Sequence, residues 1–459
     1  MALSGLQIYK LLPGGLKPPH PKANCKECGY PTCLAFAMKL AAKQAELSAC
    51  KYVTDAARQE LESASAPPIR LITLSADGNK MEVGNETVLF RHEKTFYHPT
   101  GLFVRVRDTQ PRAEVETFVR QAGTFSVDYV GIALRLNGFA VEAASGNAST
   151  FADCVATVAA ASKLPLILMA KDAAILAAGA KKATGHTPLL YAAETGNWQA
   201  MAALAKEQKC PLVVRYDDNL EALAALVEQV KGAGVEDIVL DPGARGARAS
   251  LHALTQIRRL ALRNFRLLGY PVIAFPGEGT SGPDLEILLA GQQIAKYAGI
   301  VVLDHFSPAT AYALLVLRQN LFTDPQKPIQ VEPGIYPLNN PQPDSPVLVT
   351  TNFSITDFSV ANELESMGLP AWLLVADAEG MSVLTAWAAG KFDADKIVKT
   401  VRGTGIADRV NRRVVIIPGH VAVLLGELEE ELSDWRVLVG PREAVDIGAF
   451  LKTLPARLG

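Results

Sequence analysis

The chain has 459 residues, of which 49% are hydrophobic and only 7% aromatic, and its formal net charge is −2. This length predicts roughly two to four domains with aliphatic cores, and the near-neutral charge without a basic block argues against nucleic-acid binding. Six cysteines are too few for a disulfide framework, the apolar runs are too short to span a membrane, and no export signal is evident at the start. We therefore expect a cytoplasmic protein.

Four of the six cysteines lie near the N-terminus, at Cys25, Cys28, Cys33 and Cys50. Four thiolates suit either zinc or an iron–sulfur cluster. Zinc ribbons usually combine two Cys-x-x-Cys pairs, whereas here one pair is followed by two single cysteines. We therefore predict that these four residues bind a [4Fe-4S] cluster, with structural zinc as the alternative.

The apolar segment 34–41 predicts a helix directly after the third cysteine. A straight helix from Cys33 to Cys50 would separate the two thiols by roughly 25 Å, which is too far for one cluster. The chain must therefore reverse, and we expect the turn near Lys43 and Gln44. We assign the cluster domain to residues 1–60.

Two changes of composition divide the rest of the chain. The segment 62–68 is rich in Ser, Ala and Pro, which indicates a short linker. The segment 325–346 contains seven prolines, which predicts an extended, semi-rigid tether. We accordingly expect a second domain at 69–325, a proline-rich linker at 326–346 and a third domain at 347–459.

Between these linkers, short apolar segments alternate with helical ones. Eight such strand–helix units of about thirty residues each predict a (β/α)8 TIM barrel rather than an open sheet. We expect its strands at 101–106, 129–134, 165–169, 188–191, 211–215, 237–241, 271–275 and 300–304. Before them, apolar runs at 69–74 and 86–90 flank Asp77-Gly78-Asn79, which predicts a hairpin that plugs the N-terminal face of the barrel.

After the tether, four apolar segments alternate with helical segments, at 347–351, 372–376, 413–417 and 435–439. They predict a small doubly wound, Rossmann-like α/β domain, in which ligands bind at the carboxyl ends of the strands. Those ends are rich in Gly, Ser, Thr and Pro, at 350–354, 377–382, 418–420 and 440–443. Small residues let backbone amides approach a ligand closely, so we expect a ligand at this edge, although Gly440-Pro441 alone is equally typical of a turn.

The run from Asn24 to Met38 resembles the cluster module of one protein family, the large (gamma) subunits of corrinoid/iron–sulfur proteins of the acetyl-CoA (Wood–Ljungdahl) pathway. The resemblance extends along the whole chain, through the segments 90–98, 240–244, 350–354, 383–387, 390–392 and 439–443. The cysteine module alone is shared with other electron-transfer subunits, but the ordered set of segments is specific to this family.

The resemblance implies a cluster domain, a barrel and a C-terminal corrinoid-binding domain, in a heterodimer with a smaller barrel subunit. It also implies a methyl carrier of the carbon monoxide dehydrogenase/acetyl-CoA synthase system, without a catalytic side chain because the chemistry takes place at cobalt. The Co(I) corrinoid accepts a methyl group from methyltetrahydrofolate, or a methyltetrahydropterin, on a separate methyltransferase and passes it to acetyl-CoA synthase. The [4Fe-4S] cluster reduces cobalt that has been oxidised to Co(II), and a reductive activator is a further expected partner.

The family position also implies which residues contact the corrinoid. The loop expected near the corrin ring, with Thr385 near its lower face, consists of Gly380, Met381, Ser382, Val383, Leu384, Thr385 and Ala386. The residues expected to line the tail of the corrinoid are Thr351, Ser354, Thr356, Gly419, His420, Val421, Ala422, Val423, Gly440 and Arg442.

No Asp-x-His-x-x-Gly motif, the source of the lower-ligand histidine in many cobalamin proteins, occurs in the chain. We therefore expect a base-off corrinoid whose unligated lower face favours four-coordinate Co(I), because Co(II) then lacks a donor that would hold it oxidised. His420 departs from the family, which tends to have a small residue there. A lone loop histidine is more often solvated or hydrogen-bonded than a ligand.

Two other functions fit parts of the sequence. The barrel could itself be the methylpterin:corrinoid methyltransferase, because barrel enzymes carry their active sites at the carboxyl strand ends. Polar residues occur at those expected ends, namely Arg135, Asn137, Asp172, Asp217, Asn219, Asp241 and Asp304. Alternatively, an electron-transfer iron–sulfur flavoprotein would hold a flavin in the last domain, although the first loop there lacks the Ser/Thr run that would bind a flavin phosphate.

Overall fold

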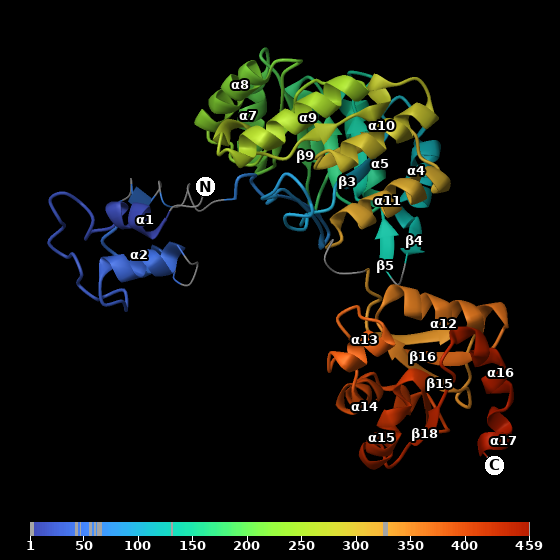
Figure 1. Cartoon of the computed structure of the whole chain (residues 1–459). Helices are drawn as coiled ribbons and strands as arrows, with labels where there is room; N and C mark the ends of the chain where they lie inside the picture. The colour runs from blue at the N-terminus through green and yellow to red at the C-terminus, as the bar shows by residue number, and fades with distance from the viewer. Residues whose placement is uncertain are drawn as a thin grey trace. The chain divides into compact units, whose positions relative to one another are not determined.

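The computed structural model of the chain describes residues 4–41, 45, 47–54, 57–58, 61, 67–129, 132–324 and 329–458. Backbone contacts divide the chain into two compact units, one formed by 1–124 and 136–318 and the other by 125–135 and 319–459. The first unit contains the N-terminal module and the barrel, and the second contains the C-terminal sheet (Figure 1).

The N-terminal module is built from the helices α1 (Gly5–Leu11) and α2 (Cys33–Ala41) and the 3-10 turn η1 (Leu47–Ala49). Ser4 and Gln7 form a capping box that satisfies backbone N–H groups at the start of α1. The two helices pack side by side around buried residues such as Phe36 (Figure 1). The helix predicted at 34–41 is confirmed, whereas the turn predicted at Lys43 and Gln44 lies outside the described residues.

A β-hairpin precedes the barrel, with strands β1 (Ile72–Ala76) and β2 (Asn79–Val83). Asp77 and Gly78 form its turn, and their φ angles of 44° and 91° are those that a type I′ turn requires. The hairpin predicted here is confirmed. Its second strand is 79–83 and not 86–90, because the two-residue turn brings the returning strand directly after Gly78. The other edge of β1 pairs with the short strand β8 (His186–Thr187).

Parallel strands form a nearly closed eight-stranded barrel in the order β11-β10-β9-β7-β6-β3-β13-β12 (Figure 1). They are β3 (Gly101–Arg107), β6 (Gly138–Glu142), β7 (Leu166–Met169), β9 (Leu189–Ala193), β10 (Leu212–Arg215), β11 (Ile238–Asp241), β12 (Ile273–Ala274) and β13 (Ile300–Leu303). A bridge between Leu240 and Val272 joins the two ends of this order. The barrel predicted from eight strand–helix units is therefore confirmed.

One predicted barrel strand is wrong. The segment 129–134 contributes to an antiparallel hairpin, β4 (Ser126–Tyr129) with β5 (Ile132–Arg135), which belongs to the second unit. The barrel strand is instead β6, whose residues Phe139, Ala140 and Val141 are fully buried. In β5 only Leu134 is buried, so that hairpin cannot serve as a strand enclosed on both faces.

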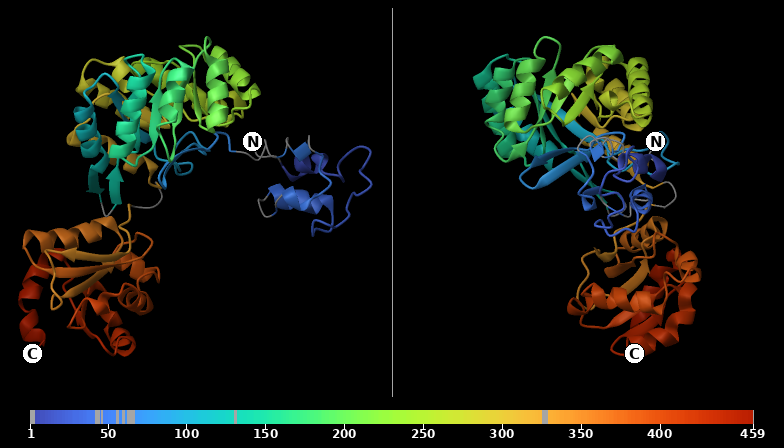
Figure 2. Two further views of the ribbon diagram at one scale, coloured as in Figure 1. Left: turned by 180° about the vertical axis from the view of Figure 1, so that it is seen from behind. Right: turned by 90° about the vertical axis from the view of Figure 1, so that its left-hand side faces the viewer.

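Helices alternate with the strands and cover the outside of the barrel (Figure 2). They are α4 (Arg112–Thr124), α5 (Ala148–Ala161), α6 (Ala173–Ala180), α7 (Trp198–Gln208), α8 (Leu220–Gly232), α9 (Ala247–Leu262), α10 (Pro283–Ala295) and α11 (Pro308–Phe322), with the 3-10 turns η2 (Arg266–Leu268) and η3 (Pro276–Gly279). Of the helices that the structure describes, none has the length and apolar character needed to cross a membrane.

Apolar side chains fill the barrel near the amino ends of its strands. Phe103 and Ile300 are fully buried there in one cluster with Leu74 and Met81 of the β1–β2 hairpin. A Cβ atom at Gly101, the first residue of β3, would lie 2.6 Å from the Met81 side chain. The hairpin therefore closes the amino end of the barrel, as predicted, and leaves the carboxyl ends of the strands as the open face.

The second unit is built around a five-stranded sheet in the order β14-β16-β15-β17-β18. Its strands are β14 (Gly334–Leu338), β15 (Val347–Thr351), β16 (Ala371–Ala376), β17 (Val414–Ile417) and β18 (Arg436–Val439). Strands β15 to β18 run parallel, so their carboxyl ends meet at one edge. The four strands predicted after the linker are confirmed.

Strand β14 lies inside the segment 326–346 that was expected to be an extended tether. It pairs antiparallel with β16 at the edge of the sheet, so the tether prediction is wrong at 334–338. Pro337 is tolerated because an edge strand forms hydrogen bonds on one side only. Leu338 is buried in the core of the unit. Residues 325–328, at the start of the expected linker, lie outside the described part of the chain.

Helices cover both faces of this sheet (Figure 2). Val349 and Leu374 face a core shared with α13, α14 and α15, whereas Leu348 and Leu373 face a core shared with α12, α16 and α17. The helices and turns are α12 (Ser354–Ser366), α13 (Val383–Ala388), α14 (Ala394–Gly403), η4 (Ile406–Asp408), η5 (Gly419–Leu424), α15 (Leu425–Glu431), η6 (Ala444–Asp446), α16 (Ile447–Lys452) and α17 (Leu454–Leu458).

Candidate functional site

The four predicted cluster ligands lie in the N-terminal module. Cys25 and Cys28 are partly exposed, whereas Cys33 and Cys50 are only 7% and 6% exposed and belong to the module's core. All four are free thiols. The buried pair belongs to the helical core of the module, and the other pair lies in the loop before α2.

Asn24 holds the loop that carries the first two cysteines. Its side-chain oxygen accepts the backbone N–H of Cys33 at 2.8 Å, and its own backbone N–H points at the Cys33 sulfur at 3.3 Å. Asn24 and Lys26 have φ angles of 56° and 65°, which turn the chain sharply around Cys25. Hydrogen bonds to sulfur stabilise thiolates and tune iron–sulfur clusters.

The four thiols share one electrostatic environment. Burial raises the pKa of Cys50, the nearby backbone N–H of Tyr52 opposes this shift, and the charges of the other three thiols add to it. Among the described residues, no group of three or more His, Cys, Asp or Glu side chains is arranged to hold a metal ion. A cationic iron–sulfur core would relieve the repulsion among four thiolates, so the donor set fits this group, and the ligation stays a prediction.

A pocket of about 320 Å³ opens at the carboxyl edge of the C-terminal sheet. Seven of the predicted corrinoid contacts line it, namely Thr356, Ser382, Val383, Leu384, His420, Gly440 and Arg442. The other ten are not among its lining residues, namely Thr351, Ser354, Gly380, Met381, Thr385, Ala386, Gly419, Val421, Ala422 and Val423. Each of the four strand tips expected to share a ligand thus contributes some of its residues to one pocket.

Apolar residues that the sequence did not single out complete the pocket. They are Leu348, Val349, Ile355, Val360, Ile416, Ile417 and Ile447. They come from β15, β17, α12 and α16, which meet only in the folded sheet. No sequence signal distinguishes such wall residues from ordinary core residues, because both appear as apolar positions in strands and helices.

Thr350, in the strand tip 350–354 where a ligand was expected, is the most informative pocket residue that the predicted corrinoid contacts did not include. It lines the pocket and is 1% exposed, and its hydroxyl has no hydrogen-bond partner among the described residues. A buried hydroxyl without a partner costs roughly 1–3 kcal/mol, so a polar ligand atom in the pocket would satisfy it. The hydroxyl of Thr351 is equally buried and also unpartnered within the described structure, but it does not line the pocket. Two adjacent threonines ending an apolar strand were the available sequence signal.

Asn352 positions the loop that leads to the predicted ring contacts. It is 1% exposed, and its side-chain oxygen accepts the backbone N–H groups of Ala378 at 2.8 Å and Gly380 at 3.0 Å. Its amide group donates to Asp377 at 3.4 Å. Gly380 has a φ of 71°, which favours glycine. Asn352 therefore joins the carboxyl ends of β15 and β16 into one fixed edge ahead of Ser382.

Two of the predicted glycines serve the packing of loops. A Cβ atom on Gly419 would lie 2.6 Å from the carbonyl oxygen of Gly440, and the Gly419 N–H donates to the carbonyl of Pro441 at 2.9 Å. The loops after β17 and β18 therefore touch backbone to backbone. The absence of a side chain at Gly419 is what lets these two pocket loops meet.

Large apolar side chains are exposed on the elements that border the pocket. They are Ile355 at 65%, Phe358 at 64%, Leu384 at 48%, Trp387 at 42%, Val423 at 70% and Val445 at 70%. Ile355 and Leu384 also line the pocket itself. Exposed apolar groups around a pocket typically contact a large ligand or a partner protein.

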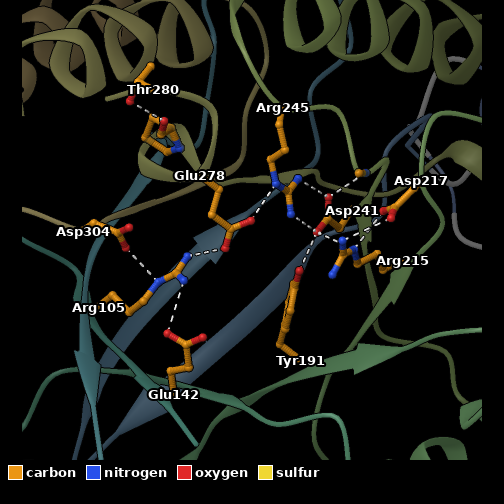
Figure 3. Close-up of polar contacts among 12 residues, drawn as sticks. Arg105, Glu142, Tyr191, Arg215, Asp217, Asp241, Arg245, Glu278, Thr280 and Asp304 are labelled. Atoms are coloured by element: carbon orange, nitrogen blue, oxygen red, sulfur yellow. Dashed lines mark hydrogen bonds and ion pairs between the residues drawn. The ribbon is translucent and has the colours of Figure 1, made fainter. Parts of the chain in front are cut away.

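The open face of the barrel carries a network of ion pairs (Figure 3). Arg105, whose side chain is 4% exposed, contacts Glu142 at 3.3 Å, Glu278 at 2.6 Å and Asp304 at 2.9 Å. Three carboxylates therefore surround one guanidinium at the centre of the barrel. Figure 3 shows Glu278 placed between this arginine and Arg245.

Asp241 is the centre of the other half of the network. It is fully buried and receives two hydrogen bonds of 3.0 Å from Arg245 and one of 2.7 Å from the Tyr191 hydroxyl (Figure 3). Burial opposes ionisation, but the hydrogen bonds and charge of Arg245 outweigh it and hold the pKa of Asp241 below its usual value. Arg215 lies 3.9 Å from Asp241 and 3.0 Å from Asp217.

The other polar residues predicted at the barrel's strand ends have structural contacts. Asp172 and Asn219 are the N-caps of α6 and α8. Asn137 accepts the backbone N–H of Leu102 at 3.0 Å. Arg135 is not at a barrel strand end, because it lies in the β4–β5 hairpin.

The residues of both candidate sites lie within segments that match known protein families. The family model described as "CO dehydrogenase/acetyl-CoA synthase delta subunit" matches residues 71–451, and a "Putative Fe-S cluster" model matches residues 21–52, which include all four cysteines. The corrinoid/iron-sulfur protein large subunit of Moorella thermoacetica is 45% identical over 453 residues, covering 98% of this chain and 99% of that protein. The acetyl-CoA decarbonylase/synthase complex subunit gamma of Archaeoglobus fulgidus is 35% identical, covering 98% of each.

Similarity to solved structures is much weaker. A dihydropteroate synthase from Xanthomonas albilineans aligns with 56% of this chain and 100% of its own length, at 15% identity and a TM-score of 0.40. A similarity this low carries no functional argument. The family is instead established by the long sequence matches, which run through the cysteine module, the barrel and the C-terminal sheet. The chain belongs to the CO dehydrogenase/acetyl-CoA synthase delta-subunit family and, within it, to the large (gamma) subunits of corrinoid/iron–sulfur proteins.

Proposed function

We propose that this chain is a methyl carrier that holds a base-off corrinoid at the carboxyl edge of its C-terminal sheet and a [4Fe-4S] cluster in its N-terminal module. The observation that carries the proposal is the pocket at this edge, with its apolar walls and the unsatisfied hydroxyl of Thr350. The full-length similarity to corrinoid/iron–sulfur protein large subunits supports the choice of ligand. The protein is expected to work in the cytoplasm.

The pocket suits the tail of a corrinoid better than its ring. A volume of about 320 Å³ is at the lower end of small-ligand pockets and cannot enclose a macrocycle. The aliphatic walls would bury the aromatic base, and Thr350 would bind one of its polar atoms. Thr356, Ser382 and Arg442 would then bind the polar groups of the tail. The remaining predicted contacts stay proposals.

The ring would rest on the exposed apolar side chains beside the pocket, including Ile355 and Leu384. When bound, the corrinoid supplies a cobalt atom that accepts a methyl group and gives it up again. The Ser382 and Thr385 hydroxyls lie 3.0 Å apart and hydrogen-bond to each other. Thr385 therefore offers only a neutral group near the lower face, and no strong donor that would hold cobalt oxidised.

Cys25, Cys28, Cys33 and Cys50 would hold the cluster, with Asn24 fixing the loop around it. The cluster supplies single electrons, which we propose return inactive cobalt to its reactive oxidation state. The methyl donor would be a methyltetrahydrofolate or methyltetrahydropterin methyltransferase, and the acceptor would be acetyl-CoA synthase. A smaller barrel subunit and a reductive activator are the other proposed partners.

The charges at the barrel's open face argue against a second candidate, in which the barrel itself is the methyltransferase. Arg105 and Arg245 are each bound by carboxylates, and Glu278 is shared between them (Figure 3). These charges are already paired within the barrel, so a substrate would have to displace existing partners to bind them. We therefore propose that the barrel is a scaffold.

Removal of the Thr350 hydroxyl tests the pocket. Thr350→Val should weaken cobamide binding about fivefold, because the hydrogen bond to the ligand contributes about 1 kcal/mol, while the cobamide-free protein should be unaffected or slightly stabilised. Thr400→Val is the matched control, because that hydroxyl lies on α14 and already donates to the carbonyl of Lys396 at 2.8 Å. Equal cobamide affinity of wild type and Thr350→Val, measured by spectrophotometric titration, would remove the main support for this site.

A further inference from the structure

Positive charge is concentrated in the N-terminal module. Residues 1–61 contain eight Lys and Arg against four Asp and Glu, a formal charge of +4. Because the whole chain has a net charge of −2, the remaining residues carry −6. The module that carries the four cysteines is thus positively charged, whereas the rest of the chain is negatively charged.

Two of its lysines are adjacent in sequence to predicted cluster ligands. Lys26 follows Cys25, and Lys51 follows Cys50. Both lysines are exposed. Consecutive Cα atoms are about 3.8 Å apart, so the backbone of each lysine lies next to that of a predicted ligand.

A third lysine is brought to the same surface by Tyr52. The Lys22 ammonium lies 5.8 Å from the centre of the Tyr52 ring and 3.8 Å from the carboxylate of Glu27. The Tyr52 hydroxyl donates to that carboxylate at 2.9 Å. The contact between Glu27 and Tyr52 brings the segments around Cys28 and Cys50 together. Each segment carries an exposed lysine, and we call these two residues and Lys22 the lysine rim: Lys22, Lys26 and Lys51.

The lysine rim includes Lys26, which lies between the two more exposed of the four cysteines. Cys25 and Cys28 are partly exposed, whereas Cys33 is buried at the start of α2. Lys39 lies six residues further along α2, about 9 Å along the helix axis from Cys33.

We propose that the lysine rim is the docking surface for an acidic protein that donates single electrons. This inference rests on the proposed function of the four cysteines. One electron leaves the donor's metal centre, which is oxidised, and enters the cluster, which is reduced, without a change in covalent bonds or protons. Complementary charges of this kind raise association rates by about 10- to 1,000-fold at low ionic strength and lose this effect as salt screens them.

Glu27 positions one lysine of the rim and offsets only one of the rim's three positive charges. It is the acidic residue contacted by both Lys22 and Tyr52, so it fixes the position of that lysine. The predicted docking is fast and transient, because it depends on steering by exposed charges rather than on burial of a large apolar area. An acidic ferredoxin is a suitable probe.

Charge reversal on the full chain tests the proposal. Lys22→Glu combined with Lys51→Glu should lower the second-order rate constant of cluster reduction by reduced ferredoxin at least tenfold at low ionic strength and flatten its salt dependence. Binding of oxidised ferredoxin, followed by fluorescence anisotropy, should weaken in parallel. Lys39→Glu, a single charge reversal outside the rim, is the control and should change either quantity much less than the double variant does.

Reduced methyl viologen, a small cation, separates docking from damage to the cluster. The lysine rim repels it, so the double variant should be reduced by viologen at an equal or higher rate. Slower reduction by both reagents, or unchanged kinetics and binding with ferredoxin, would overturn the docking surface. Iron and sulfide analysis separates failure of the docking surface from failure of the proposed function. A wild-type chain without a cluster contradicts both proposals. A full cluster with unaltered ferredoxin kinetics in the double variant contradicts the docking surface alone.

Discussion

Replacement of Arg245 by methionine should destabilise the barrel by about 3 kcal/mol, because it leaves the fully buried carboxylate of Asp241 without its main partner. Breaking one partner of a buried pair typically costs about 3–5 kcal/mol. The lower end applies here, since Asp241 keeps the hydroxyl of Tyr191 at 2.7 Å and the N–H of Gly243 at 2.8 Å. Methionine keeps an unbranched apolar stem but lacks the guanidinium, which lies 5.0 Å from the centre of the Phe275 ring, so the loss of this contact adds to the destabilisation.

The position of Arg245 explains why the destabilisation should be greatest where strands β11 and β12 meet. Strands β11 and β12 are joined by the bridge between Leu240 and Val272. Arg245 follows β11 and reaches both Asp241 at the end of that strand and Glu278 after β12, at 3.0 and 2.7 Å. It therefore ties together the two strands at which the barrel closes. Backbone amides of β11 and β12 should exchange faster with deuterium in the variant.

Urea unfolding followed by circular dichroism measures the predicted loss. Arg248→Met, an exposed position at the start of α9, is the control and should change the free energy of unfolding by less than about 0.5 kcal/mol. Asp241→Asn added to Arg245→Met should recover part of the loss, because it removes the unpaired charge. Since the pKa of Asp241 is lowered in the wild type, its contribution is present above about pH 4 and lost as the pH falls, so the difference should shrink in acid. A loss below about 1 kcal/mol at pH 7, or no recovery in the double variant, would refute the reasoning.

Three further predictions concern the cofactor sites and the C-terminal unit. Cys28→Ala should abolish the cluster and reductive reactivation, which iron analysis and visible spectra measure, while methyl transfer from already reduced cobalt should survive. Zinc without acid-labile sulfide in the wild-type protein would contradict this prediction. Burial and the charge of Asp128 raise the pKa of Asp357 to about 6, so ionisation of this carboxyl group destabilises the protein as the pH rises through that value. Asp357→Asn should therefore stabilise the protein by about 1 kcal/mol at pH 8 and have no effect near pH 4. His420→Ala should leave the nitrogen coupling in the Co(II) electron paramagnetic resonance spectrum unchanged, and disappearance of a superhyperfine pattern would identify His420 as an axial ligand.

The eight-stranded barrel was predictable because alternation of apolar segments with helical segments is a local signal that repeats along the chain. Its errors arose where local signals were equivalent. The segments 129–134 and 138–142 are both short and apolar, and only pairing with β3 and β7 selects the second as the barrel strand. Likewise, Pro337 indicated a tether, but the free edge of β16 accepts a proline-containing strand.

The candidate sites differ in the same way. The four cysteines could be predicted as ligands because metal-binding spacing is contained in the sequence itself. The pocket could be predicted only as an edge rich in small residues, since its walls come from strands and helices far apart in the chain. The sequence predicted the tip 350–354, but only the folded structure shows that Thr350 lines the pocket with a hydroxyl that has no hydrogen-bond partner among the described residues.

Metal analysis and electron paramagnetic resonance of the anaerobically purified full chain test the central claim most directly. A methyl carrier with one corrinoid and one [4Fe-4S] cluster predicts about four iron atoms and one cobalt atom per chain. Oxidation to Co(II) should give a base-off signal without nitrogen superhyperfine splitting. A chain that contains zinc or flavin but no cobalt would contradict the account.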